Sequence, residues 1–261
     1  MLARVRTMQT RYLPNGPLDV LWQVLLFAAA YYGYRMVRGL VDDPAAAAAA
    51  FANARNLIEI QRDLGFFVEP SIQAWAAAKP AIIDFASWMY INAQTSVTLA
   101  SLAYLYVFHN TSFYFVRNMF MVAMAIALLG YIVYPTAPPR FFPEWGFFDA
   151  VSDFVGVSHD SVAVNALFNP YAAVPSMHVC FALMIAVPIA RLAKHRSTRV
   201  VWTIYPLVVI FVIVATGNHF ITDAILGALT AAVAAAAARW MARARPAAWT
   251  FAPARQPTVA T

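Results

Sequence analysis

The chain has 261 residues, of which 62% are hydrophobic and 11% are charged, whereas about a quarter of the residues in a soluble domain are charged. This composition excludes a soluble globular protein and is typical of a membrane protein. The net charge of +6 does not indicate nucleic-acid binding, because the cations stand in short clusters beside apolar stretches. The single cysteine, Cys180, lies in an apolar segment and is interpreted as a core residue.

Six apolar segments approach the roughly 20 residues that a helix needs to cross a bilayer. A backbone in lipid must pair its own polar groups, so these segments are expected to be helical. The sequence therefore predicts an all-α, polytopic membrane protein with six transmembrane helices, at residues 18–39, 81–108, 114–134, 175–193, 200–216 and 218–238. We expect a cytoplasmic segment at 1–17, one membrane domain at 18–238 and a basic cytoplasmic tail at 239–261.

The first apolar segment superficially resembles a cleavable signal peptide, with arginines before it and alanines inside it. Three tyrosines near its end, Tyr31, Tyr32 and Tyr34, instead suit the aromatic belt of a span that is retained.

Between the first two spans, residues 44–79 mix alanines with charges, and Pro44 is suited to begin a helix. We expect an amphipathic helical pair on the membrane surface there, or a packed connector.

The distribution of arginine and lysine predicts the orientation, because short cytoplasmic loops are enriched in these residues. Both chain ends and the loop at 191–199 are basic, whereas the loop at 135–174 carries one cation, Arg140, among four acids. The sequence therefore places both termini inside and the loop at 135–174 outside.

Two sequence motifs, "AVPSMH" and "GNHFITD", each place a histidine near the start of a predicted span. Because four residues make about one helical turn, His219 and Asp223 share a face, and the carboxylate can accept the imidazole N–H. This contact would leave the other ring nitrogen of His219 free to attack phosphorus. His178, on the same predicted side of the membrane, is suited to act as general acid and base.

The phosphoryl oxygens of such a reaction need a fixed positive charge. Arg140 in "PTAPPR" is the candidate, since a guanidinium can hold phosphate through two bonds; anchoring to lipid headgroups or to a loop acid is the alternative. Ser176 is a candidate phosphate contact or a helix cap. Tyr171 and Asn218 are further candidate substrate contacts, as is Asn169, although turn formation explains the asparagines almost as well.

Other polar residues of the chain have simpler interpretations. His109, His159 and His195 are read as structural residues. Asp84 falls inside the second predicted span, where an acid commonly faces a cavity or a partner, so it is a functional suspect. His178, His219 and Asp223 are also acceptable zinc ligands, although we expect a site without metal or other cofactor.

The motifs "PTAPPR", "PSMH" and "HFITD", in this order on six spans, resemble the phosphatidic acid phosphatase type 2 superfamily. Within it the chain looks most like the inositol phosphorylceramide synthase and sphingomyelin synthase branch. The resemblance covers roughly residues 55–236, including "LGFFVEPSIQAW". It implies a nucleophile at His219, an acid/base at His178 and a partner at Asp223, on the outer or lumenal membrane face.

The chain departs from the phosphatase pattern at three positions. Val133 and Ile213 stand where that pattern has a lysine and an arginine, and Met177 replaces a glycine. Two phosphate ligands are therefore absent, which favours a phosphodiester substrate over a phosphomonoester.

We expect a lipid phosphotransferase that uses a phospholipid donor and a hydroxyl acceptor through a phosphohistidine intermediate. A lipid phosphatase with water as acceptor is the alternative, and a non-catalytic lipid-binding or transport protein is a weaker one. The arginine-rich, alanine-rich composition favours a bacterial plasma membrane.

Overall fold

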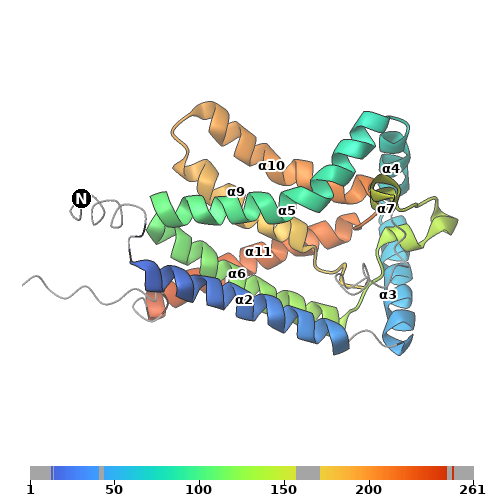
Figure 1. Ribbon diagram of the computed structural model, residues 1–261. Coiled ribbons are helices and arrows are strands. Elements are labelled where there is room, and N and C mark those ends of the chain that lie inside the picture. Colours follow the sequence, from blue (N-terminus) through green and yellow to red (C-terminus); the bar gives the residue numbers. More distant parts are fainter. Residues whose placement is uncertain (1–12, 14, 41–43, 157–170, 246–248, 250–261) are drawn as a thin grey trace, which may run out of the picture.

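The computed structural model describes residues 13, 15–40, 44–156, 171–245 and 249, most of which are helical, with no strand among them. Six long helices run side by side in Figure 1. They are α2 (Pro17–Leu40), α5 (Pro80–Phe108), α6 (Asn110–Val133), α9 (Met177–Leu192), α10 (Arg196–Ala215) and α11 (Ile221–Ala244). Their bounds agree with the six predicted segments to within a few residues, apart from the later end of α11 and the earlier starts of α6 and α10.

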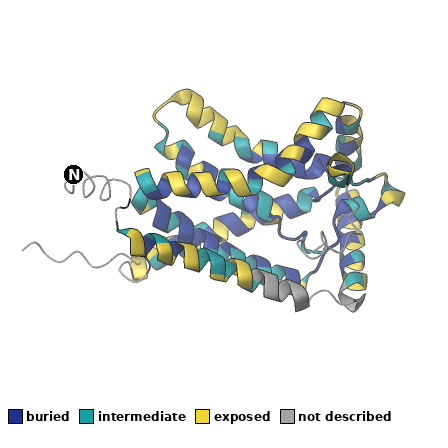
Figure 2. Ribbon diagram, in the orientation of Figure 1, coloured by how far each residue is buried: buried dark blue, intermediate teal, exposed yellow. Residues whose placement is uncertain are grey.

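Three of these helices are long and apolar enough to cross a membrane, namely α6, α10 and α11, and α9 is a shorter apolar helix. The protein is therefore an integral membrane protein. Large apolar side chains such as Leu207, Leu229 and Trp240 face outward from the bundle, and Figure 2 shows exposed stripes along the outer surfaces of the helices. Because α2 and α5 do not meet the same criterion, the count of six crossings stays a prediction.

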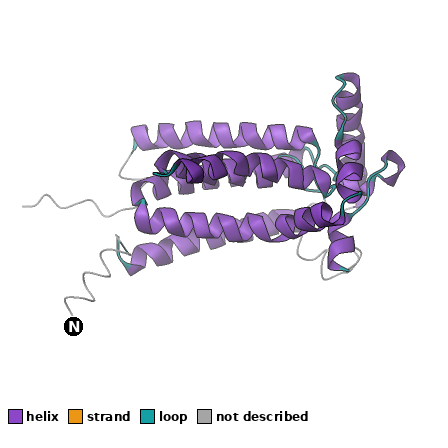
Figure 3. Ribbon diagram, turned by 90° about the horizontal axis from the view of Figure 1, so that it is seen from above, coloured by secondary structure: helices purple, strands orange, loops and turns teal. Residues whose placement is uncertain are grey.

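The helix α3 (Pro44–Asp63) lies across one end of the bundle in Figure 1. The view from above in Figure 3 also shows helical segments at that end that run crosswise to the long helices. We call this end, which also holds α4 (Glu69–Ala77), α7 (Ala150–Val155) and the short 3-10 helices η1 (Pro139–Phe141) and η2 (Pro143–Trp145), the capped end. The opposite end, with the turns at His109 and at 193–195, is the far end.

Residues 44–79 form helices, as predicted, and their buried side packs on protein. Ala50, Ala54 and Ile58 of α3 pack with Phe142 and Phe220, beside Phe147. This packing supports the packed-connector interpretation over a helix pair that rests only on lipid. Apolar side chains also face outward from this segment, among them Leu64 and Trp75.

A buried polar cluster at the far end of the bundle joins α2, α5 and α6, and we call it the far-end network. Asp19 accepts hydrogen bonds from Tyr106 at 2.8 Å, from Tyr114 at 2.6 Å and from Gln23 at 2.9 Å. Arg117, fully buried in α6, donates to Gln23 at 3.0 Å, to Asn118 and to the Trp249 carbonyl. This network fixes the first helix to its neighbours, and the composition of the chain gave no hint of it.

Candidate functional site

The sequence between α10 and α11 folds into a tight turn that presents His219. After α10 ends at Ala215, Gly217 adopts a φ of +69°, a conformation that residues with a Cβ rarely take. The backbone N–H groups of Asn218 and His219 both donate to the Ile213 carbonyl, at 3.0 and 3.1 Å. His219 is thereby held just before the first turn of α11.

Asp223 lies in the first turn of α11 and contacts the His219 ring, as their spacing predicts. The His219 Nδ1 atom is 3.2 Å from Asp223 Oδ2, and the same oxygen accepts the Phe220 N–H at 2.9 Å. Asp223 is fully buried, and its Oδ1 atom has no hydrogen-bond partner among the described residues. The carboxylate is therefore oriented by two donors and has one oxygen left unpaired.

His178, in the first turn of α9, comes next to His219 although 41 residues separate them in the sequence. The two ring centroids are 5.4 Å apart, with an interplanar angle of 66°. The start of α9 is held close to α11, because the Ser176 N–H donates to the Asp223 carbonyl at 3.0 Å. Gly227 permits this approach, since a Cβ there would lie 2.3 Å from the Ser176 carbonyl oxygen.

Arg140 reaches the same place from η1. Its backbone N–H donates to the Gly217 carbonyl at 2.8 Å, and its Nη1 donates to the Asn218 side chain. Its Nε lies 3.5 Å from Asp149 Oδ2, an ion pair without hydrogen-bond geometry, and its side chain is 10% exposed. Burial lowers the pKa of Arg140, while the Tyr90 phenol and the Asp149 carboxylate act in the opposite direction.

The electrostatic surroundings of His219 favour its neutral form. Burial, the larger cause, and the Arg140 charge lower the pKa of His219 to about 3, although a hydrogen bond to the Ala173 backbone acts in the opposite direction. A neutral imidazole retains a lone pair for attack, so this environment suits a nucleophile. We call His178, His219, Asp223, Arg140 and Asn218 the histidine cluster.

The remaining predicted site residues have different surroundings. Ser176 precedes α9, is fully buried and makes no side-chain capping bond, and its Oγ has no partner among the described residues. Tyr171 packs against Phe51 of α3 and Phe141 of η1, with ring centroids 6.2 and 6.5 Å away, and we call these three rings the aromatic layer. Asn169 lies outside the described residues, as does His159.

Asp84 is exposed in the second turn of α5, so it faces neither a cavity nor the histidine cluster.

Val133 and Ile213, the positions at which the phosphatase pattern has cations, differ from each other in exposure. Val133 is 77% exposed at the end of α6, whereas Ile213 is fully buried and lines a pocket beside His178. A longer side chain would therefore reach the site region from position 213.

Three buried residues of the connector between α2 and α5 also hold the site, and sequence reasoning missed their role. Glu69 accepts the Ile221 N–H at 2.9 Å, and Gln61 donates to the Thr222 hydroxyl at 3.0 Å, so both fix the start of α11. Gln73 donates to the Phe148 carbonyl at 2.9 Å and accepts its N–H at 3.3 Å. Burial raises the pKa of Glu69. The signal was the four-residue spacing of Glu69 and Gln73 within "LGFFVEPSIQAW", which places them on one helical face.

A narrow pocket beside His178 runs between α5, α9 and α10. Its walls are mostly apolar, and it is lined by Met89, Tyr90, Ala93, Gln94, Thr98, His178, Phe181, Ala182, Tyr205, Val209, Val212 and Ile213. Tyr90 is a fourth residue that sequence reasoning missed, because an aromatic residue in an apolar segment gives no signal of its own.

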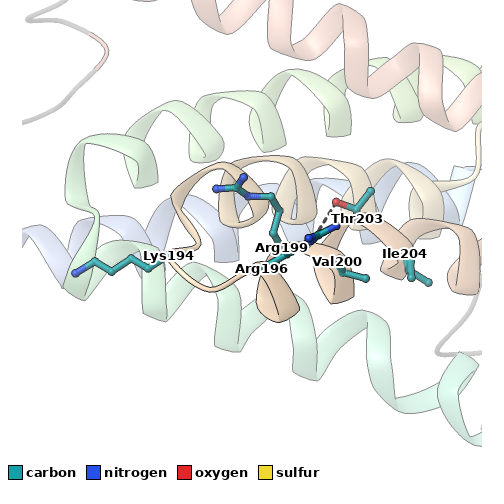
Figure 4. A pocket seen from close by; sticks show the side chains of 6 residues that line it. All are labelled: Lys194, Arg196, Arg199, Val200, Thr203 and Ile204. Atoms are coloured by element: carbon teal, nitrogen blue, oxygen red, sulfur yellow. Dashed lines mark hydrogen bonds between the residues drawn. The ribbon is translucent and has the colours of Figure 1, made fainter.

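Another hollow lies at the far end, next to the turn between α9 and α10. Lys194, Arg196 and Arg199 line it with Val200, Thr203 and Ile204, and Figure 4 shows the Lys194 side chain extending away from the others. It shares no residue with the histidine cluster. Within the described ranges, no three His, Cys, Asp or Glu side chains are placed to hold a metal ion, so this geometry lends no support to the zinc alternative.

Comparison with known proteins gives one match. The family model described as the PAP2 superfamily matches residues 55–237, which is more than half of the chain and includes the whole histidine cluster. No curated protein and no solved structure matches the chain.

Proposed function

Because the chain belongs to the PAP2 superfamily, whose chemistry is that of phosphatases and phosphotransferases on lipid phosphates, we propose that it is a membrane lipid phosphotransferase. It moves a phosphoryl or phospho-alcohol group from a phospholipid to a hydroxyl acceptor. The observation that carries this proposal is the meeting of His219, paired with Asp223 at 3.2 Å, with the His178 ring and the Arg140 guanidinium.

His219 is the proposed nucleophile, and Asp223 holds its ring. In the first half-reaction, the ring nitrogen opposite Nδ1 forms a bond to phosphorus while the bond from phosphorus to the lipid alcohol oxygen breaks. The leaving oxygen takes a proton from His178. In the second half-reaction, the acceptor hydroxyl gives its proton to His178, its oxygen bonds to phosphorus, and the phosphorus–nitrogen bond breaks.

Arg140 is the proposed charge that holds the phosphoryl oxygens, and Asn218 orients it through their hydrogen bond. The Ser176 hydroxyl and the start of α9 offer further donors from the other side of the cluster. Tyr171 is proposed to contact the substrate from the segment that precedes α9, although its ring packs in the aromatic layer and not on the histidines.

The apolar lining of the narrow pocket beside His178 supports a lipid as the substrate, because it places hydrocarbon surface next to the proposed acid/base histidine. We also propose that six helices cross the membrane within residues 18–238, that both termini are cytoplasmic, and that the capped end faces outward. The basic turn at the far end, with Lys194, Arg196 and Arg199, supports this orientation. A bacterial plasma membrane remains the proposed location.

Transfer is favoured over hydrolysis, and a phosphodiester over a phosphomonoester, because Val133 and Ile213 supply no positive charge. The bulky Met177, where the phosphatase pattern has a glycine, is the feature that likens the chain to the inositol phosphorylceramide synthase and sphingomyelin synthase branch. The close alternative is a lipid phosphate phosphatase, which shares the first half-reaction and uses water in the second.

The test is a donor and acceptor screen by mass spectrometry with purified protein in lipid nanodiscs. We expect headgroup transfer to an added alcohol, abolished in His219→Ala, and a phosphorylated His219 peptide after acid-free quenching. Rapid release of headgroup phosphate without any alcohol would establish the phosphatase instead. Lipid turnover that is unchanged in His219→Ala would overturn the enzyme, and turnover lost with a chelator and restored by zinc would overturn the metal-free mechanism.

A further inference from the structure

Tyr90 stacks on the proposed acid/base histidine. The ring centroids of Tyr90 and His178 are 4.6 Å apart, and the planes differ by 22°. This is a face-to-face contact, whereas His178 meets His219 at 66°. The stack fixes the plane of the His178 ring, and therefore the direction in which its nitrogens point.

Tyr90 also lies near the turn that holds His219, because it lines the pocket beside His178 together with Ile213, whose carbonyl accepts the N–H groups of Asn218 and His219. In the pocket beside His178, the nearest wall from α10 is apolar and includes Val212 and Ile213. The other polar residues that α5 contributes, Gln94 and Thr98, lie about one and two turns further from the cluster. Among the polar residues that α5 contributes to this pocket, Tyr90 is thus the one that stacks on the acid/base histidine.

We propose that Tyr90 is a substrate-binding and positioning residue of this site. Its ring holds the His178 imidazole in the orientation needed for proton transfer, and its hydroxyl donates a hydrogen bond to the phosphoryl group that Arg140 holds. A phenol is a neutral donor, so it binds a phosphodiester, which carries one negative charge, without the second cation that a phosphomonoester requires. The inference rests on the proposed function and names the substrate class that the site selects.

Two substitutions separate the two roles. Tyr90→Phe keeps the stack and removes the hydroxyl, so KM for a phosphodiester lipid should rise about tenfold, the equivalent of one hydrogen bond, while kcat changes less than about threefold. Tyr90→Leu removes both, so kcat should also fall, by about tenfold or more. A kcat that is higher in Tyr90→Phe than in Tyr90→Leu would show that the stacked ring contributes to turnover.

The matched control lies on the same helix. Tyr104, near the far end of α5, pairs with His109, with ring centroids 5.4 Å apart and a hydroxyl-to-Nε2 distance of 3.2 Å. Tyr104→Phe and Tyr104→Leu should leave both KM and kcat unchanged. Thermal unfolding in the same nanodiscs identifies any variant that is poorly folded, and activity is expressed per folded protein.

The outcomes are distinguishable from failure of the proposed function. If the wild type shows turnover that depends on His219 and both Tyr90 variants match it, Tyr90 has no such role while the enzyme stands. If Tyr90→Phe lowers kcat as much as Tyr90→Leu does, the stacking role is wrong. If no phospholipid is turned over in a manner that depends on His219, the proposed function itself fails, and this inference fails with it.

Discussion

Two buried polar clusters lie at opposite ends of one helix bundle, and they differ in how completely their groups are paired. In the far-end network, both carboxylate oxygens of Asp19 accept hydrogen bonds, and Arg117 donates to three acceptors. In the histidine cluster and next to it, Asp223 Oδ1, Arg140 Nε and Ser176 Oγ have no hydrogen-bond partner among the described residues.

The difference fits the proposed phosphate-binding role of the histidine cluster. An unpaired buried polar atom costs about 1–3 kcal/mol, so a purely structural cluster gains by complete pairing. Groups that bind a phosphate must keep hydrogen-bonding capacity for it. The incomplete pairing in the histidine cluster therefore supports the proposed phosphate-binding role. Variants of the two clusters should differ in their effects on turnover and on stability.

The largest effect is expected from Asp223→Asn, which should lower kcat about a thousandfold. Asp223 Oδ2 contacts both the Phe220 N–H and His219 Nδ1, so an amide oxygen at that position can still accept from both. The substitution removes the negative charge that would stabilise the cationic ring of His219 formed on attack. Steady-state transfer assays measure the loss, and a kcat within threefold of wild type would show that the charge of Asp223 is not required.

Arg140→Gln should lower kcat/KM about a hundredfold, because it removes the charge that holds the phosphoryl oxygens. It should also raise the pKa of His219, because the Arg140 charge lowers that pKa; any acid limb of the pH–rate profile due to His219 should therefore move to higher pH. The control is Arg62→Gln, at the same end, where Arg62 lies 5.0 Å from the Trp145 ring centroid. Equal losses in both variants would contradict a specific role.

Gly227→Ala should lower kcat about tenfold or more, because the new Cβ would lie 2.3 Å from the Ser176 carbonyl and displace the start of α9, which carries His178. Gly33→Ala is the matched control, since a Cβ there meets nothing within 4 Å. The assay is turnover per folded protein; unchanged turnover in Gly227→Ala would mean that the distance between the two histidines is not tightly required.

A smaller effect is expected at Glu69. Glu69→Gln keeps an acceptor for the Ile221 N–H and should change kcat less than about threefold, whereas Glu69→Ala should lower it about tenfold. Burial raises the pKa of Glu69 above its unfolded value, so its contribution to stability falls as the pH rises through the folded pKa. Glu69→Gln should remove that dependence. Unfolding temperatures at pH 5 and pH 8 test this, and identical pH responses of the two proteins would contradict it.

The sequence predicted the six long helices because apolar length and helical pairing of the backbone are both local properties. It also predicted the contact between His219 and Asp223, because four residues in a helix give one turn. It did not predict that Tyr90 stacks on His178, since two spans distant in sequence must pack before an aromatic residue of one meets a histidine of the other. Glu69 stood in the sequence as one charge of a polar connector, whereas in the structure it is buried and accepts the Ile221 N–H at the start of α11. This contact also forms only when segments distant in sequence pack together.

Asp84 and Asp19 show that the sequence alone does not predict which carboxylates are buried. Asp84 stood out because it falls inside a predicted span, yet it is exposed. Asp19, at the edge of the first span, gave no signal and is buried with three donors around it. The sequence shows that a carboxylate lies near a membrane segment, whereas the packing of the neighbouring helices decides whether it finds partners.

The smallest effect on turnover, and a clear one on stability, is expected from Asp19→Asn in the far-end network. The amide has one acceptor oxygen in place of two, so at least one of the Tyr106, Tyr114 and Gln23 donors would lose its present bond, and stability should fall by roughly 1–3 kcal/mol. Turnover per folded protein should stay at the wild-type level, because the whole length of the bundle separates Asp19 from His219. A loss of kcat without a lower unfolding temperature would show that the two ends are coupled, and the far-end network would then have to be counted as part of the functional machinery.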